Sequence, residues 1–188
     1  LKEYTDNSGS KPLVSGMFEF ELKALGIVEN GQIVDTDISK VPMPEGSVNG
    51  SIITTNEGHN ITFPAVKFTQ KQLNDLGVST ITYRYQLSEV IPANKVVGMT
   101  YDDTKFVVDV VVTIDGSHLL NVSANYPDNQ NVATFKNKYT PIPVKTDING
   151  KKTLTGRDMK SGESFEFNLS GADAATNLAV RNGVVSVP

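Results

Sequence analysis

The sequence predicts an all-β protein, folded as an antiparallel β-sandwich. Apolar and aromatic residues alternate with polar ones through several segments, as they do in strands with one buried face. Turn-forming pairs such as Asn-Gly and Asp-Gly punctuate these segments, and only one short stretch has a helical pattern. Strands that each bury one face, with little helix to cover them, bury those faces most readily against a second sheet.

Four segments give the clearest alternation. They are "GMFEFELKAL", "STITYRYQLSEV", "TKFVVDVVVTI" and "HLLNVSA", which begin at residues 16, 79, 104 and 118. Because successive side chains of a strand point to opposite faces, each segment has one predicted inward face. In chain order these faces are Phe18, Phe20 and Leu22; Ile81, Tyr83, Tyr85 and Leu87; Phe106, Val108, Val110 and Val112; and Leu120, Val122 and Ala124. The pair Asp115-Gly116 predicts a hairpin between the last two segments.

The rest of the first 140 residues is less regular. One short helix is predicted in "TQKQLNDLG", with Thr69 as its N-cap and Gly77 as its end. The segment from about Val28 to Asn60 has a weak pattern and is expected to hold short strands and surface loops. In "TYDDTKF", the acidic pair Asp102-Asp103 is interpreted as a turn before a strand.

A proline-rich stretch divides the chain. "TPIPVKT", at residues 140–146, contains two prolines around an isoleucine and cannot continue a central strand. We therefore predict one complete domain at residues 1–140, followed by a linker at 141–146.

The residues after the linker resemble the beginning of the chain. "SFEFNL" at 164–169 resembles "MFEFEL" at 17–22, and "GVVSVP" at 183–188 resembles "HNITFP" at 59–64. Residues 147–188 are therefore predicted to be the opening strands of a second copy of the same domain. About 40 residues without a metal or a disulfide rarely fold alone.

Composition excludes several classes of function. The net charge of −4 gives no basic footprint for nucleic acid, and no apolar run is long enough for membrane insertion. There are no cysteines, and the isolated His59 and His118 suggest solvated loop residues and no metal site. No cofactor is expected. No secretory signal opens the chain and no sorting signal closes it, so we expect it to be a piece of a larger protein.

Two polar side chains are predicted to face the core. In "ATFKNKY", Asn137 shares a face with Phe135 and Tyr139, and Glu89 continues the inward face of the second segment. A buried amide or carboxyl is costly unless a partner binds it. For Glu89 the alternative is that the strand ends at Leu87 and the carboxyl turns to solvent.

A lysine is the third candidate. Lys152 precedes the strand-like "FEF" of the second copy, and its counterpart in the first copy should lie before Phe18. Lys2 fits, since it shares a face with Tyr4; Lys11 is the rival, in turn-like sequence. Surface exposure is the alternative for either lysine.

A buried lysine, glutamate and asparagine together have a specific chemical use. Desolvation lowers the pKa of a lysine and raises that of a glutamate, so the amine becomes a neutral nucleophile and the acid keeps its proton. Attack on the asparagine carbonyl, with the glutamate moving protons, expels ammonia and leaves an isopeptide bond. The reaction happens once, on the protein itself.

Five motifs together resemble the pilin isopeptide-linkage domain of Gram-positive surface proteins. They are "KKTLTGRDMKSGESFEFNL", "ITFPAVKFT", "ITYRYQLSEV", "GMTYDDTKFVVDVVVTIDG" and "ATFKNKY". The family includes streptococcal major pilins, and its Ig-like fold is similar to collagen-adhesin B-type domains. The resemblance implies that Lys2 is the nucleophile, Glu89 the proton shuttle and Asn137 the acceptor. Lys152 would be the nucleophile of the second domain.

The implied function is a structural stalk or shaft module of a pilin or adhesin. Such a module is extracellular, anchored to the cell wall through parts of the parent protein outside this chain, and contacts other domains of that protein or neighbouring pilus subunits. One alternative is a module that binds a host protein or glycan, which predicts an exposed aromatic or Arg-rich patch in a sequence that has no Trp. The other is a conventional hydrolase using Glu89, which would need a second carboxylate at productive distance.

Overall fold

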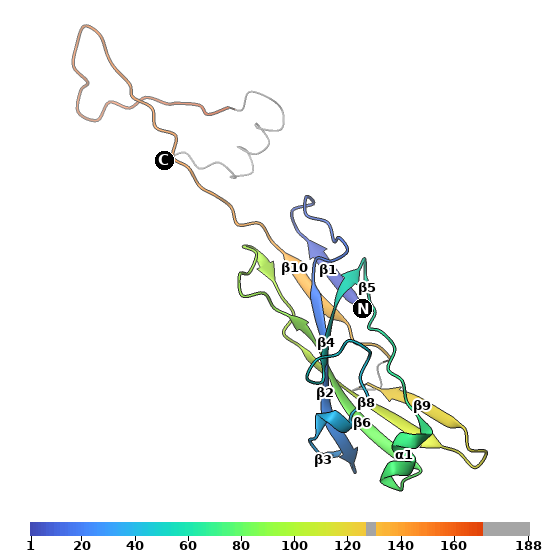
Figure 1. The fold of residues 1–188 in the computed structure, drawn as a ribbon. Coiled ribbons are helices and arrows are strands. Elements are labelled where there is room, and N and C mark those ends of the chain that lie inside the picture. The colour runs from blue at the N-terminus through green and yellow to red at the C-terminus, as the bar shows by residue number, and fades with distance from the viewer. Residues whose placement is uncertain (127–130, 171–188) are drawn as a thin grey trace. The chain divides into compact units, whose positions relative to one another are not determined.

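The computed structural model describes residues 1–126 and 131–170 (Figure 1). The chain divides into two compact units, Leu1–Pro141 and Ile142–Pro188. Strands dominate the first unit, so the all-β prediction is confirmed. Its elements are β1 (Lys2–Asp6), β2 (Glu19–Glu29), β3 (Gln32–Asp35), the 3₁₀ turn η1 (Ile38–Lys40), β4 (Ser51–Glu57), β5 (Asn60–Ile61), α1 (Gln70–Leu76), β6 (Thr80–Val90), β7 (Met99–Thr100), β8 (Lys105–Ile114), β9 (Leu120–Asn125) and β10 (Phe135–Tyr139).

The strands form a large sheet and a small one. The large sheet has the order β5-β4-β2-β6-β8-β9, with β3 paired to the far end of β2. The small sheet has the order β1-β10-β7. Among the described strands, β1 and β10 pair in parallel and the other pairings are antiparallel. The prediction of antiparallel sheets therefore holds for every described pairing except that of β1 with β10. A hairpin enforces antiparallel neighbours, but β1 and β10 come from opposite ends of the domain and no hairpin joins them.

The core lies between the two sheets and continues under α1. One cluster surrounds Tyr83 and Leu73, both completely buried, at the α1 end of the large sheet. The other surrounds Phe20 and Phe135, where the small sheet covers the large one. Strand β2 is long enough to contribute to both clusters. The second cluster is the one that encloses the candidate site.

The predicted inward faces of β2, β6 and β8 are confirmed, and that of β9 is wrong. Val122 is 52% exposed and Ala124 is also exposed, so only Leu120 of the predicted face packs against the core. Strand β9 is at the edge of the wide sheet, and its one partner among the described strands is β8. The opposing sheet is narrower, so it leaves this edge uncovered.

The predicted helix and the predicted hairpin at Asp115-Gly116, which joins β8 to β9, are confirmed. Helix α1 begins after Thr69, whose backbone N–H donates to the Gln72 side chain at 2.7 Å, and ends at Gly77 in the left-handed conformation. The segment from Val28 to Asn60 contains β3, β4, the start of β5 and η1, joined by loops. Gly26, with φ of 148°, lies at an irregularity in β2 where a Cβ would collide with the carbonyl oxygen of Asp35.

The described part of the second unit, residues 142–170, contains no helix or strand. The strand expected at 164–169 is therefore absent from the described residues, and Phe167 is 73% exposed. A strand needs a neighbour to satisfy its backbone hydrogen bonds, and no other strand occurs within 142–170. An ion pair between Arg157 and Glu163 joins two parts of this segment. One of the turn-forming Asn-Gly pairs of the sequence, at residues 182–183, and the "GVVSVP" segment lie outside the described residues.

Candidate functional site

Three strands from both sheets bring Lys2, Glu89 and Asn137 together. Lys2 on β1 is opposite Phe135 on β10, so Asn137 lies two residues further along the neighbouring strand. Strands β1 and β10 are neighbours in Figure 1. The alternation of each strand turns both side chains into the core. Glu89 comes from β6 of the opposing sheet, where it is paired with Phe20 of β2. The cluster therefore spans the two sheets.

Glu89 bridges the other two side chains. The Lys2 Nζ lies 2.9 Å from Glu89 Oε2, and the Asn137 Nδ2 donates to Glu89 Oε1 at 2.5 Å. Lys2, Glu89 and Asn137 are 1%, 7% and 3% exposed. Strand β6 continues to Val90, so the alternative that it ends at Leu87 with Glu89 in solvent is wrong.

The fold places the two candidate lysines in different surroundings. Lys2 is buried at the cluster, whereas the Nζ of Lys11 lies 4.6 Å from the ring centre of Tyr139. Lys2 is held by its backbone as well: its N–H donates to the carbonyl oxygen of His59 at 2.8 Å, and His59 Nδ1 lies 2.8 Å from its carbonyl oxygen. His59 is exposed in the turn between β4 and β5, as the sequence suggested, and these hydrogen bonds also join that turn to β1.

Burial moves both ionisable groups toward their neutral forms. Desolvation lowers the pKa of Lys2 from its ordinary value, against the opposing effect of the hydrogen bond to Glu89. Desolvation likewise raises the pKa of Glu89, against the hydrogen bonds from Asn137 and Lys2. Burial penalises the charged form of each group, so a neutral amine next to a protonated acid becomes accessible.

Aromatic rings enclose the cluster and exclude water from it. The Lys2 Nζ lies 4.2 Å from the ring centre of Phe18 and 5.7 Å from that of Phe20. The Phe135 ring packs against Phe20 and Phe106, with centroid separations of 5.1 and 5.0 Å. In such surroundings electrostatic contacts are stronger than in water.

The sequence of the chain matches the model of a known family over residues 1–140, a family described as Spy0128-like isopeptide containing domain (FctA). The chain belongs to this family. The match covers the whole first domain, including all three strands that carry Lys2, Glu89 and Asn137.

A comparison with solved structures matches this chain to major pilins of Streptococcus pyogenes. One has 16% identity and a TM-score of 0.38, with 73% of this chain and 48% of that chain covered. Another, the T-13 major pilin, has 14% identity and a TM-score of 0.30, with 73% and 49% covered. The chain thus spans about half the length of these pilins. A comparison with curated proteins found no significant match.

Sequence reasoning missed one contact of the cluster. The backbone N–H of Asp102 donates to Asn137 Oδ1 at 3.1 Å. The carboxylate of Asp102 accepts from the backbone N–H of Thr104 at 2.9 Å and from that of Lys136 at 2.6 Å. The "DDT" sequence signals the local turn to Thr104. It contains no signal for the contacts with β10.

Lys152 lies outside the matched residues and is not part of this cluster. It is exposed, and its Nζ lies 5.2 Å from the ring centre of Phe165. Within residues 1–126 and 131–170, no group of three or more His, Asp or Glu side chains could hold a metal ion. No helix in the described part of the chain is long and apolar enough to cross a membrane.

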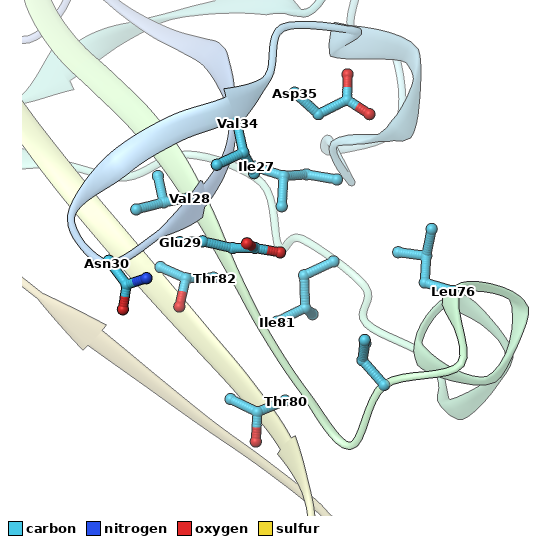
Figure 2. A pocket seen from close by; sticks show the side chains of 11 residues that line it. Ile27, Val28, Glu29, Asn30, Val34, Asp35, Leu76, Thr80, Ile81 and Thr82 are labelled. Atoms are coloured by element: carbon cyan, nitrogen blue, oxygen red, sulfur yellow. The ribbon is translucent and has the colours of Figure 1, made fainter.

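A separate hollow lies at the α1 end of the first unit (Figure 2). It has a volume of about 550 Å³ and is bordered by the β2–β3 hairpin, the end of α1 and the start of β6. Ile27, Leu76 and Ile81 supply apolar surface, and Glu29 and Asp35 are its acidic residues. None of the lining residues is aromatic or an arginine, the residue types that the binding-module alternative predicts.

Proposed function

We propose that residues 1–140 form a structural domain of a Gram-positive surface protein, held by an isopeptide bond between Lys2 and Asn137. The observation that carries the proposal is the bridging of both side chains by one buried carboxyl, Glu89. The family match supports the same function, since it is a family of isopeptide-containing domains.

The bond would form in one turnover. A proton passes from the Lys2 ammonium to Glu89, and the neutral Nζ attacks Cγ of Asn137, whose π electrons move to Oδ1. Glu89 gives its proton to Nδ2 and takes one from Nζ, which makes Nδ2 a leaving group. The carbonyl re-forms, the Cγ–Nδ2 bond breaks and ammonia leaves. The fold contributes proximity, because it holds amine and amide against the same carboxyl.

The position of the bond suits a load-bearing module. Lys2 is on the first strand of the domain and Asn137 on the last, and these strands are neighbours in the small sheet. Tension applied at the two ends of the domain would therefore pass through a covalent link and spare the hydrogen bonds between strands. In the chain-entropy model, a closed loop from residue 2 to 137 stabilises the fold by about 5 kcal/mol.

The larger protein is proposed to be an extracellular pilin or an adhesin with a stalk, anchored to the cell wall through other parts. Its partners would be further domains of the same protein and, in a pilus, neighbouring subunits. Residues 141–146 would be a linker and 147–188 the start of a second copy, in which Lys152 would be the nucleophile. A hydrolase is disfavoured: Asp102, a second carboxylate near Glu89, already accepts two backbone N–H groups.

Intact mass spectrometry of the denatured chain tests the proposal. The measured mass should be lower than the sequence mass by one ammonia, and digestion should yield a peptide pair joined through Lys2 and Asn137. Glu89→Ala should keep the ammonia, whereas Glu19→Ala, which removes an exposed glutamate from the neighbouring β2, should lose it. A wild-type mass equal to the sequence mass would contradict the proposal.

A further inference from the structure

The amide of Asn137 is held in one orientation by two contacts of opposite kind. The backbone N–H of Asp102 can only donate a hydrogen bond, so the Asn137 atom that it contacts at 3.1 Å must be the oxygen, Oδ1. The other amide atom, Nδ2, then faces Glu89 Oε1. The leaving nitrogen is thereby placed at the proton shuttle, and the carbonyl oxygen is placed at a separate donor.

In the proposed reaction, negative charge develops on the atom that Asp102 contacts. Attack of the Lys2 amine sends the carbonyl electron pair to Oδ1 of Asn137. Glu89 is occupied by Nδ2 and by Lys2 and, among the hydrogen bonds of the described residues, it gives none to Oδ1. A fixed donor in a dry site stabilises such an oxyanion without any reorganisation during the reaction.

We propose that the backbone N–H of Asp102 is the oxyanion donor for bond formation and that the Asp102 carboxylate holds it in place. The inference rests on the proposed function, because it concerns one step of that reaction. The N–H touches a reacting atom and is the catalytic group; the carboxylate acts through the backbone and is a positioning group.

The Asp102 carboxylate is suited to this role because it hydrogen-bonds to β10 just beyond the point where β7 stops pairing with that strand. Strand β7 pairs with β10 at residues 138 and 139 and stops at Thr100. Two residues later, the Asp102 carboxylate accepts a hydrogen bond from the backbone N–H of Lys136, the residue next to Asn137. Its other contact, to the N–H of Thr104, fixes the turn into β8. Asp102 therefore fastens its own loop to β10 beside Asn137.

Two substitutions separate the donor from its support. Asp102→Ala removes the carboxylate and keeps the N–H, whereas Asp102→Pro removes both. Asp102→Asn keeps an oxygen that can accept from Lys136 but carries no charge, so it shows whether geometry or charge matters. Asp103→Ala is the matched control, since Asp103 is the adjacent, exposed aspartate.

The rate of ammonia loss is the readout. Each full chain is isolated unfolded from inclusion bodies in concentrated urea, and folding is started by dilution. Circular dichroism reports folding and intact mass reports the bond, so slow folding is distinguished from slow chemistry. We expect Asp102→Pro to slow bond formation by about 10²- to 10³-fold, as for loss of an oxyanion donor. Asp102→Ala should be intermediate, and Asp102→Asn and Asp103→Ala should approach the wild-type rate.

The outcomes distinguish this inference from the proposed function. If wild type loses ammonia and both Asp102→Ala and Asp102→Pro do so at the same rate, the inference is overturned and the isopeptide bond stands. If Asp102→Pro does not fold, the comparison of wild type, Asp102→Ala and Asp102→Asn decides. If the Asp102 carboxylate has only a structural role, Asp102→Ala should lower the melting temperature in a Glu89→Gln background, where no bond forms. It should then leave the rate of ammonia loss unchanged in the chain that keeps Glu89. If wild type never loses ammonia, both proposals fail.

Discussion

Replacing Glu89 by glutamine should remove the proposed crosslink while leaving the packing of the cluster almost unchanged. The glutamine side chain has nearly the same volume, but its single oxygen can accept from only one of the two donors, Lys2 Nζ and Asn137 Nδ2, and it cannot carry a proton between them. We therefore expect Glu89→Gln to fold and to retain its ammonia. Glu19→Gln, an exposed change on the neighbouring strand, is the control and should lose the ammonia as wild type does.

The size of the effect follows from the loop that the bond closes. Without a covalent link between residues 2 and 137, the unfolded chain regains conformational entropy worth about 5 kcal/mol. The first unit, Leu1–Pro141, would unfold with an entropy change of roughly 0.3 kcal/mol/K at the midpoint. The melting temperature of Glu89→Gln should therefore lie about 17 °C below that of wild type.

Intact mass and a calorimetric melt of the same sample test the two parts separately. Complete loss of ammonia in Glu89→Gln would show that Glu89 is not the proton shuttle. Retained ammonia with a melting temperature within about 3 °C of wild type would refute the entropic argument, because that shift corresponds to only about 1 kcal/mol.

Three further predictions follow from burial and from the described second unit. Bond formation needs one proton shared by Lys2 and Glu89, so its rate should be bell-shaped in pH: excess acid protonates the amine, and alkali removes the shuttle's proton. Burial raises the Glu89 pKa above 4.5 and lowers the Lys2 pKa below 10.5, so both limbs of the pH–rate curve should lie between pH 4.5 and pH 10.5. A rate that does not depend on pH would contradict this prediction. Tyr83→Phe should be neutral or stabilising by up to about 1 kcal/mol in urea unfolding, since the buried hydroxyl has no protein partner among the described residues. Tyr85→Phe should cost about 1 kcal/mol, because its hydroxyl donates to a buried carbonyl at 2.7 Å; equal effects would refute the argument. Limited proteolysis should cut first within residues 142–170, because the described chain has no helix or strand there. If this segment resists the protease as well as the first unit does, the predicted domain boundary is wrong.

Local patterns determined much of the fold. The period of two in β2, β6 and β8 identified the residues that line the core, and the cap residues Thr69 and Gly77 marked the limits of α1. These features depend on residues close in the chain. For the same reason, alternation with aromatic neighbours indicated that Glu89 and Asn137 face inward.

The alternation of side chains could not predict features that depend on which strands pair and on which sheet packs over which strand. The alternation of β9 is as regular as that of β8, yet Val122 is exposed because the small sheet does not reach that edge. The parallel pairing of β1 with β10 likewise joins the two ends of the domain, and no hairpin signal could specify it.

The sequence by itself therefore determined that this is a β protein with polar groups on its inward faces, because side-chain direction in a strand follows from local geometry. Only the tertiary structure decided which of those groups meet. The contact of Lys2 with Glu89 joins residues 87 apart, and that of Asp102 with Asn137 joins residues 35 apart. The second of these uses a backbone N–H, which every residue but proline has. Its position opposite Oδ1 is set by where β7 ends and how its loop is fastened to β10, and neither property is encoded in a short stretch of sequence.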